Sequence, residues 1–216
     1  MKKGFVLALL ISLISVAIIF SISSVAQATL FDRGNGLIYD DYLDITLMQE
    51  INSSWLLNAP GNWGNGIISW PGAMAWVAGG ITYQGISGWR MLSIENPDGS
   101  QCVGYDCPLS EFGHIWHNEL GNKNKTLTEM GPFTLYGGVS AIWAGTPDQG
   151  WPDDPPFYPY PFFNFANGYQ GFADCHIAWL AVDGDVTIVP EPSTVILLGA
   201  GLLGLVAFRR KKLVIK

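Results

Sequence analysis

Positively charged residues are scarce in the body of this chain. Seven of its 11 Lys and Arg residues lie within residues 2–3 and 209–216. Only four remain between residues 29 and 189, namely Arg33, Arg90, Lys123 and Lys125, and 17 acids there give this body a net charge of −13. Such a surface repels nucleic acid and anionic lipid, so the sequence predicts no nucleic-acid partner.

Cysteine is also rare, with only Cys102, Cys107 and Cys175 in 216 residues. A disulfide between Cys102 and Cys107 is the preferred pairing, and closing so short a loop stabilises the fold by only about 2 kcal/mol. Cys175 is then either free and buried or paired with one of the other two. Three cysteines without paired short spacings do not fit a zinc site.

Familiar catalytic motifs are missing from the sequence. No serine lies in a Gly-x-Ser-x-Gly turn, and no phosphate-binding glycine loop precedes a lysine. Cys175 and His176 are neighbours in a strand-like segment, where adjacent side chains point to opposite faces, so they do not form a nucleophile–base pair. The sequence therefore predicts that the protein is not an enzyme, with a cryptic activity as the alternative.

Aromatic residues, by contrast, are abundant. All nine Trp, all eight Tyr and eight of the 11 Phe lie between residues 29 and 189, among many Gly and Asn residues. This content excludes disorder and disfavours a helical bundle. The 161 residues of this body therefore predict one loop-rich α+β domain whose core is built from large rings.

The N-terminal segment has the three parts of a secretory signal peptide. Lys2 and Lys3 are basic, residues 5–20 are apolar, and Ala26-Gln27-Ala28 matches the small-x-small cleavage pattern. We expect residues 1–28 to be the signal peptide, with Ala26 and Ala28 at the cleavage site before Thr29. The apolar part is long, so an uncleaved anchor is the alternative.

The C-terminal segment combines Pro190-Glu191-Pro192, an apolar run over residues 195–208 and a basic cluster over 209–212. As a helix, the apolar run spans roughly 21 Å against a hydrocarbon core of about 30 Å. This order resembles the PEP-CTERM sorting tail of Gram-negative bacteria, here residues 190–216. The resemblance implies a transmembrane segment at 195–208, exosortase as processing partner, and transient inner-membrane residence before the cell surface or extracellular matrix. An ordinary single-pass anchor is the alternative.

Between these ends the sequence predicts short strands and two helices. Capping residues and apolar spacing predict helices over 70–79, after Ser69, and over 111–120, after Ser110. Alternation and turn signals predict two hairpins, which pair residues 37–40 with 44–48 and residues 162–165 with 169–174. Three further strands are expected over 88–92, 140–145 and 176–182, and the last of these is expected to be central in its sheet. Residues 31–36 and 52–68 are expected to be loops, and 147–161 an irregular proline-rich insertion.

Seven segments of the body carry a family resemblance. They are Leu37-Ile38-Tyr39-Asp40, Ser69-Trp70, Gly88-Trp89-Arg90-Met91-Leu92, Ser110-Glu111-Phe112-Gly113-His114, Ile142-Trp143-Ala144-Gly145-Thr146, Phe163-Asn164-Phe165 and Ala178-Trp179. In this order they resemble the Lcl C-terminal-like domain, over most of residues 30–186. The resemblance implies that residues 29–189 form a C-type-lectin-like domain, with two helices around short twisted antiparallel strands and long loops. Leu47, Leu92-Ser93 and Ala144-Gly145 depart from the family pattern.

Two groups of residues are candidate metal ligands. His114 and His117 lie three apart on the expected second helix, with Glu111 and Glu119 near them. This spacing can place two imidazoles on one metal, although a capped amphipathic helix explains the same residues. Asp148, Asp153 and Asp154, with Asp183 and Asp185, are weak calcium candidates, because they fit no twelve-residue calcium loop and also suit a solvated acidic loop. No other cofactor is expected.

Four loop aromatics are candidates for ligand contact: Trp63, Trp151, Tyr158 and Tyr160. Rings on loops can stack on sugars or protein partners, or can pack on their own domain. Arg90 is expected to form a structural ion pair with a nearby acid. Together these features predict an exported, non-catalytic surface or matrix protein that binds a glycan or another envelope polymer. The alternative is a self-associating structural component of the matrix.

Overall fold

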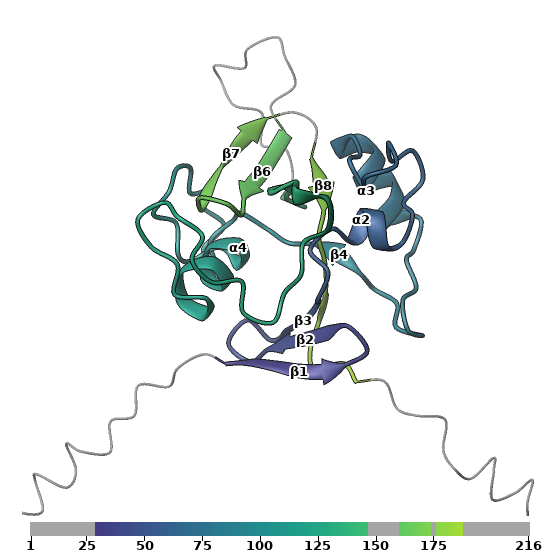
Figure 1. Ribbon diagram of the computed structural model, residues 1–216, viewed down its shortest axis with the longest axis horizontal. Helices are drawn as coiled ribbons and strands as arrows, with labels where there is room; N and C mark the ends of the chain where they lie inside the picture. The colour runs from purple at the N-terminus through teal and green to yellow at the C-terminus, as the bar shows by residue number, and fades with distance from the viewer. Residues whose placement is uncertain (1–28, 147–159, 174–175, 188–216) are drawn as a thin grey trace, which may run out of the picture.

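The computed structural model describes residues 29–146, 160–173 and 176–187, which form two β-sheets and several short helices (Figure 1). The first sheet has the strand order β1-β2-β3-β9-β4, with bounds Leu30–Gly34, Leu37–Asp40, Ile45–Met48, Leu180–Asp183 and Arg90–Met91. The second has the order β7-β6-β5-β8, with bounds Tyr169–Ala173, Tyr160–Asn164, Ala141–Trp143 and Ile177–Ala178. This mixed fold, with more sheet than helix, agrees with the expected α+β class.

The hairpin expected at residues 37–48 is confirmed. β2 and β3 are antiparallel, with Asp40 opposite Ile45. Asp40 also closes the turn, because its Oδ1 accepts hydrogen bonds from the backbone N–H groups of Tyr42 and Leu43, both at 3.0 Å. One carboxylate oxygen of Asp40 is therefore used by the local fold, and the other is not.

The two expected loops are both partly wrong. Residues 31–34 belong to β1, which pairs with β2, and the chain turns only at Asn35-Gly36. Helix α2, Ser53–Leu56, lies inside the loop expected over 52–68. It forms because Asn52 caps it, accepting a hydrogen bond from the backbone N–H of Trp55 at 3.1 Å. A single turn of helix has no apolar period that a sequence pattern can reveal.

The first expected helix is confirmed as α3, Trp70–Ala78. The Ser69 hydroxyl caps it by accepting from the backbone N–H of Gly72 at 3.2 Å, and Pro71 lies in its first turn. The second expected helix has its predicted start and end but a different interior. It begins as α4, Glu111–Gly113, and continues as the π-helix η1, His114–Glu119. In η1 the backbone N–H of Leu120 donates to the carbonyl of Ile115, five residues earlier.

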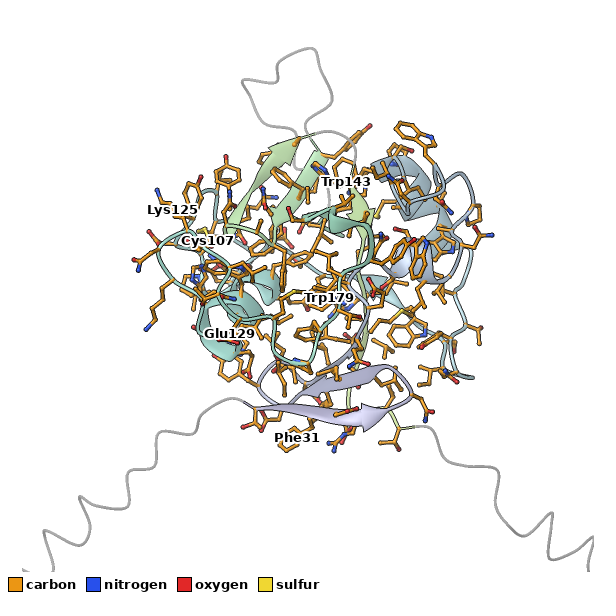
Figure 2. The ribbon with its side chains drawn as sticks, in the orientation of Figure 1. Phe31, Cys107, Lys125, Glu129, Trp143 and Trp179 are labelled. Carbon is orange, nitrogen blue, oxygen red and sulfur yellow. A yellow bond between two sulfur atoms is a disulfide. The ribbon has the colours of Figure 1, made fainter. Side chains whose placement is uncertain are left out.

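The segment 176–183 crosses from one sheet to the other. β8 pairs with β5 in parallel, which corrects the expectation of antiparallel strands only. β9 lies between β3 and β4, so the predicted central strand is confirmed there. Trp179 joins β8 to β9 at the middle of the core, where it is fully buried and donates from Nε1 to the Met48 carbonyl at 2.7 Å (Figure 2). Phe112, Phe133 and Phe165 surround its ring.

The remaining hairpin, β6–β7, is antiparallel and turns at Asn167-Gly168 as expected. The described chain begins in β1 and ends just beyond β9, and Arg33 pairs with Asp185 across this junction at 2.8 Å. In Figure 1 both described ends lie beside β1, whereas α3 and the β6–β7 hairpin lie at the opposite side of the molecule.

Within the part of the chain that the structure describes, no helix is long and apolar enough to cross a membrane. The expected signal peptide over residues 1–28, the sorting tail over 190–216 and its membrane segment over 195–208 lie outside the described residues. The C-type-lectin-like identity of the domain stays a prediction.

Candidate functional site

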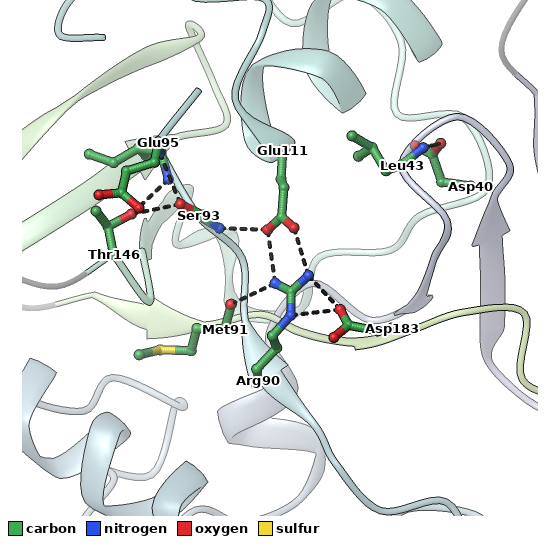
Figure 3. A network of polar contacts seen from close by, with 10 residues as sticks. Asp40, Leu43, Arg90, Met91, Ser93, Glu95, Glu111, Thr146 and Asp183 are labelled. Atoms are coloured by element: carbon green, nitrogen blue, oxygen red, sulfur yellow. Dashed lines mark hydrogen bonds and ion pairs between the residues drawn. The ribbon is translucent and has the colours of Figure 1, made fainter. Parts of the chain in front are cut away.

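Arg90 is the centre of an ion-pair network (Figure 3). Its guanidinium makes a two-point contact with Glu111, at 2.9 and 2.6 Å, and a further contact with Asp183 at 2.8 Å. Burial alone lowers the pKa of Arg90, but the hydrogen bonds and charges of Glu111 and Asp183 outweigh burial and raise it. The structural ion pair expected for Arg90 is confirmed.

A cavity of about 340 Å³ lies beside this network. Met74 and Val77 of α3 form one part of its lining, and Arg90 and Glu111 form another. Because the guanidinium already contacts two carboxylates, this cavity offers little free positive charge to an anionic ligand. Of the residues expected to contact a ligand, the two that the structure describes, Trp63 and Tyr160, do not line it.

A second cluster brings Asp40, His114 and Glu119 together. One ligand atom from each residue lies within 4.8 Å of the other two, and His114 Nε2 is 3.1 Å from Glu119 Oε1. Asp40 is fully buried and His114 is 3% exposed. The Oδ2 atom of Asp40 has no hydrogen-bond partner among the described residues. Three groups that bind protons or metals therefore converge in the interior.

Burial governs the protonation of this cluster. It raises the pKa of Glu119 to about 7, with the negative charges of Asp40 and Asp41 adding to the effect. It also raises the pKa of Asp40, against the opposing hydrogen bonds from the backbone of Leu43 and Tyr42. Burial lowers the pKa of His114, which Asp41 partly offsets. The surroundings thus disfavour charge on all three groups.

Of the two histidines that the sequence suggested as joint metal ligands, only His114 belongs to the cluster. His117 is not part of the cluster, and its ring lies edge-on to Trp116 at 4.7 Å. The partner of His114 is instead Glu119, five residues later. In an α-helix, five residues turn through about 500°, which places their side chains about 140° apart. The wider π-helix brings them to one side, so α-helical spacing could not reveal the contact.

Sequence reasoning also missed Asp40, because it assigned this residue only to the end of the strand over residues 37–40. It lies 74 positions before His114, and only the packing of the β2–β3 turn against η1 brings them together. Tyr42 in the same turn stacks flat on the His114 ring, with centroids 4.2 Å apart and planes 8° apart. The β2–β3 hairpin thus contributes a carboxylate, from Asp40, and a ring that stacks on His114, from Tyr42.

Asn52 joins three segments that each carry an aromatic residue: Trp55, half-buried, Trp63 and Tyr136. The buried Asn52 amide donates to the carbonyl oxygens of Asn65 and Tyr136, at 2.8 and 3.1 Å, and so joins two loops to α2. Tyr136 stacks on Trp55 with centroids 3.6 Å apart, and Trp63 is 69% exposed. We call Trp55, Trp63 and Tyr136 the aromatic face.

The other predicted ligand contacts have different positions. Tyr160 lies in β6, half-buried, and stacks on Trp70 of α3 with centroids 4.8 Å apart, so it has a packing role in the domain. Trp151 and Tyr158 lie outside the described residues, as do the calcium candidates Asp148, Asp153 and Asp154. Contact of these residues with a ligand stays a prediction.

The preferred disulfide is present between Cys102 and Cys107. It lies directly before α4, and Gly113 of α4 packs so closely on this loop that a Cβ there would lie 1.7 Å from the Cys107 carbonyl oxygen. The loop is also held by Gln170, whose Nε2 donates to the Cys102 carbonyl at 2.7 Å. The small disulfide loop therefore positions the helix that carries both polar clusters. Cys175 lies outside the described residues.

Comparison with known proteins identifies the tail but not the domain. Residues 189–211 match the family model of the PEP-CTERM protein-sorting motif, at the position of Pro190, Glu191 and Pro192. No curated protein and no solved structure matches the chain. The sorting motif indicates an exported protein that is held in a membrane and then processed at the surface by an exosortase.

Proposed function

We propose that this exported surface protein binds a neutral glycan or a similar envelope polymer through its folded domain, without catalysing a reaction. Its sorting motif indicates delivery to the surface, where such polymers are found. The observation that carries the proposal is the aromatic face. Trp63 is 69% exposed, and it lies on a loop that Asn52 joins to the stacked pair of Trp55 and Tyr136.

The chemistry of this face favours a sugar-like ligand. Aromatic rings offer flat apolar surfaces, and exposed groups of such rings are typical of binding sites rather than of ordinary protein surface. Leu56, 39% exposed, adds to the apolar surface on the same helix as Trp55. The net charge of −13 between residues 29 and 189 repels polyanions, so the proposed polymer is neutral. The resemblance to lectin-like domains supports the same interpretation.

A sedimentation assay with insoluble neutral polysaccharides, including those of the producing cell, tests this function. We expect the full chain to co-sediment and the Trp63→Ala variant to bind roughly tenfold more weakly, as for other central aromatic contacts. Phe31→Ala is the matched control, because Phe31 is an exposed ring, 38% accessible, on β1. Equal binding by both variants, or no binding to any neutral polymer, would contradict the proposal.

A self-associating matrix component is the second candidate, because an apolar aromatic face can equally be buried against another copy of the chain. Sedimentation velocity of the full chain without polysaccharide distinguishes the two. Under the glycan proposal the chain stays monomeric, and Trp63→Ala has no effect on its mass. Concentration-dependent assembly that Trp63→Ala abolishes favours the second candidate.

A further inference from the structure

The buried cluster of Asp40, His114 and Glu119 joins two segments that are distant in sequence. Asp40 ends β2, whereas His114 and Glu119 begin and end η1. We propose that these three side chains bind a divalent cation of the zinc class, which fastens the β2–β3 turn to η1. This proposal is independent of the aromatic face and of glycan binding.

The ligand atoms select the kind of cation. An imidazole nitrogen with carboxylate oxygens is a zinc ligand set, at bond lengths of about 2.0–2.2 Å. Calcium instead takes six to eight oxygen ligands, and magnesium prefers oxygen ligands and retained water. Two ionised carboxylates and one neutral imidazole also balance the two charges of the cation. Water supplies the fourth position.

The distances suit this geometry. Ligands at about 2.0 Å from a tetrahedral cation lie about 3.3 Å from one another, and His114 Nε2 is already 3.1 Å from Glu119 Oε1. No pair of ligand atoms in the cluster is further apart than 4.8 Å. The ligand atoms therefore need to approach one another by no more than about 1.5 Å to close the site.

A second observation is independent of this convergence. Asp40 is fully buried, and its Oδ2 has no hydrogen-bond partner among the described residues, although its Oδ1 has two. A buried carboxylate oxygen without a partner costs free energy unless something compensates it. A cation held together with His114 and Glu119 provides that compensation. Among the described residues no lysine or arginine pairs with Asp40 or Glu119.

Asn118 is the positioning residue for His114. Its Nδ2 lies 2.9 Å from His114 Nδ1, so it donates to that nitrogen while Nε2 carries the proton toward Glu119. Cation binding at Nε2 requires the proton on Nδ1, and the Asn118 amide then turns over so that its oxygen accepts. Asn118→Asp preserves an acceptor at this place, whereas Asn118→Ala removes it.

Thermal unfolding of the full chain tests the proposal. After chelation and dialysis, addition of Zn²⁺ at about 100 times its dissociation constant is expected to raise the Tm by roughly 5 °C or more. Co²⁺ is expected to give a visible absorption band from the protein-bound ion. Both responses are expected to disappear in Asp40→Asn, which keeps the turn-closing oxygen of Asp40, and in Glu119→Gln.

Two controls make the result specific. His117→Gln changes a histidine of the same helix that lies outside the cluster, and it is expected to keep both responses. Asn118→Ala is expected to weaken Zn²⁺ affinity roughly 10- to 100-fold and Asn118→Asp to restore it, with the Co²⁺ band following. A wild-type chain that shows no response to Zn²⁺, or a response that survives in Asp40→Asn, would overturn the proposal.

Discussion

The helix formed by α4 and η1 contributes one acid to each of two polar clusters, and the two clusters compensate buried charge in different ways. Glu111, at its start, meets a guanidinium from the same chain, and every charge in the Arg90 network has a partner. Glu119, at its end, meets a second carboxylate and a neutral imidazole. Removal from water disfavours charge in both places, but only the first cluster contains a permanent cation. The second therefore either stays uncharged or takes a cation from solution.

The largest expected effect comes from breaking both clusters at once. In Gly113→Ala the new Cβ would lie 1.7 Å from the backbone carbonyl oxygen of Cys107, so α4 or the disulfide loop must move. We expect the free energy of unfolding to fall by about 3 kcal/mol or more, measured by urea denaturation. Gly121→Ala serves as the comparison: its Cβ would meet nothing within 4 Å, and the strain of an alanine at its φ of +65° is expected to cost only about 1 kcal/mol. Equal losses would contradict the role of the close approach.

Replacing Arg90, the cation of the first cluster, is expected to disrupt that cluster alone. Arg90→Met leaves the carboxylate of Glu111, 19% exposed, without its ionic partner, and we expect a loss of about 3 kcal/mol in the free energy of unfolding. The Zn²⁺-dependent rise in Tm is expected to persist, since Arg90 is not a member of the second cluster. A loss below about 1 kcal/mol would mean that Glu111 finds another partner or becomes hydrated.

The smallest effect has the opposite sign. In metal-free protein, Asp40→Asn replaces a carboxylate oxygen without a partner by an amide that can donate to Glu119, and it removes one of two neighbouring acids. We expect the free energy of unfolding to rise by about 1 kcal/mol. Asp41→Asn, in the same turn but exposed, is the matched control and is expected to change it less. A clear decrease for Asp40→Asn would show that Oδ2 has a stabilising partner.

Local chemistry explains which parts of the fold were predictable. Ser69 and Ser110 are capping residues, and Asn167-Gly168 is a hairpin turn, so their elements follow from a few neighbouring positions. The crossing at Trp179 could not be predicted, because the apolar run around it fits one continuous strand as well as two short ones in different sheets.

The candidate sites depended more on packing than on pattern. The scarcity of cations predicted that Arg90 would pair with an acid. It could not predict which acid, because the partners Glu111 and Asp183 are 21 and 93 positions away. The Asp40–His114–Glu119 cluster needs a π-helix and a long-range contact, and neither has a sequence signal. The aromatic face was anticipated only through Trp63, because Trp55 and Tyr136 meet through the buried amide of Asn52.

The junction between the first and last described strands has a consequence for presentation. The chain leaves the fold beside β1, where Arg33 forms an ion pair with Asp185, and α3 and the β6–β7 hairpin lie at the far side (Figure 1). A molecule tethered from its C-terminal side thus stands with this edge toward its support. Helix α3 and the β6–β7 hairpin then lie farthest from the support, where another cell or polymer can reach them.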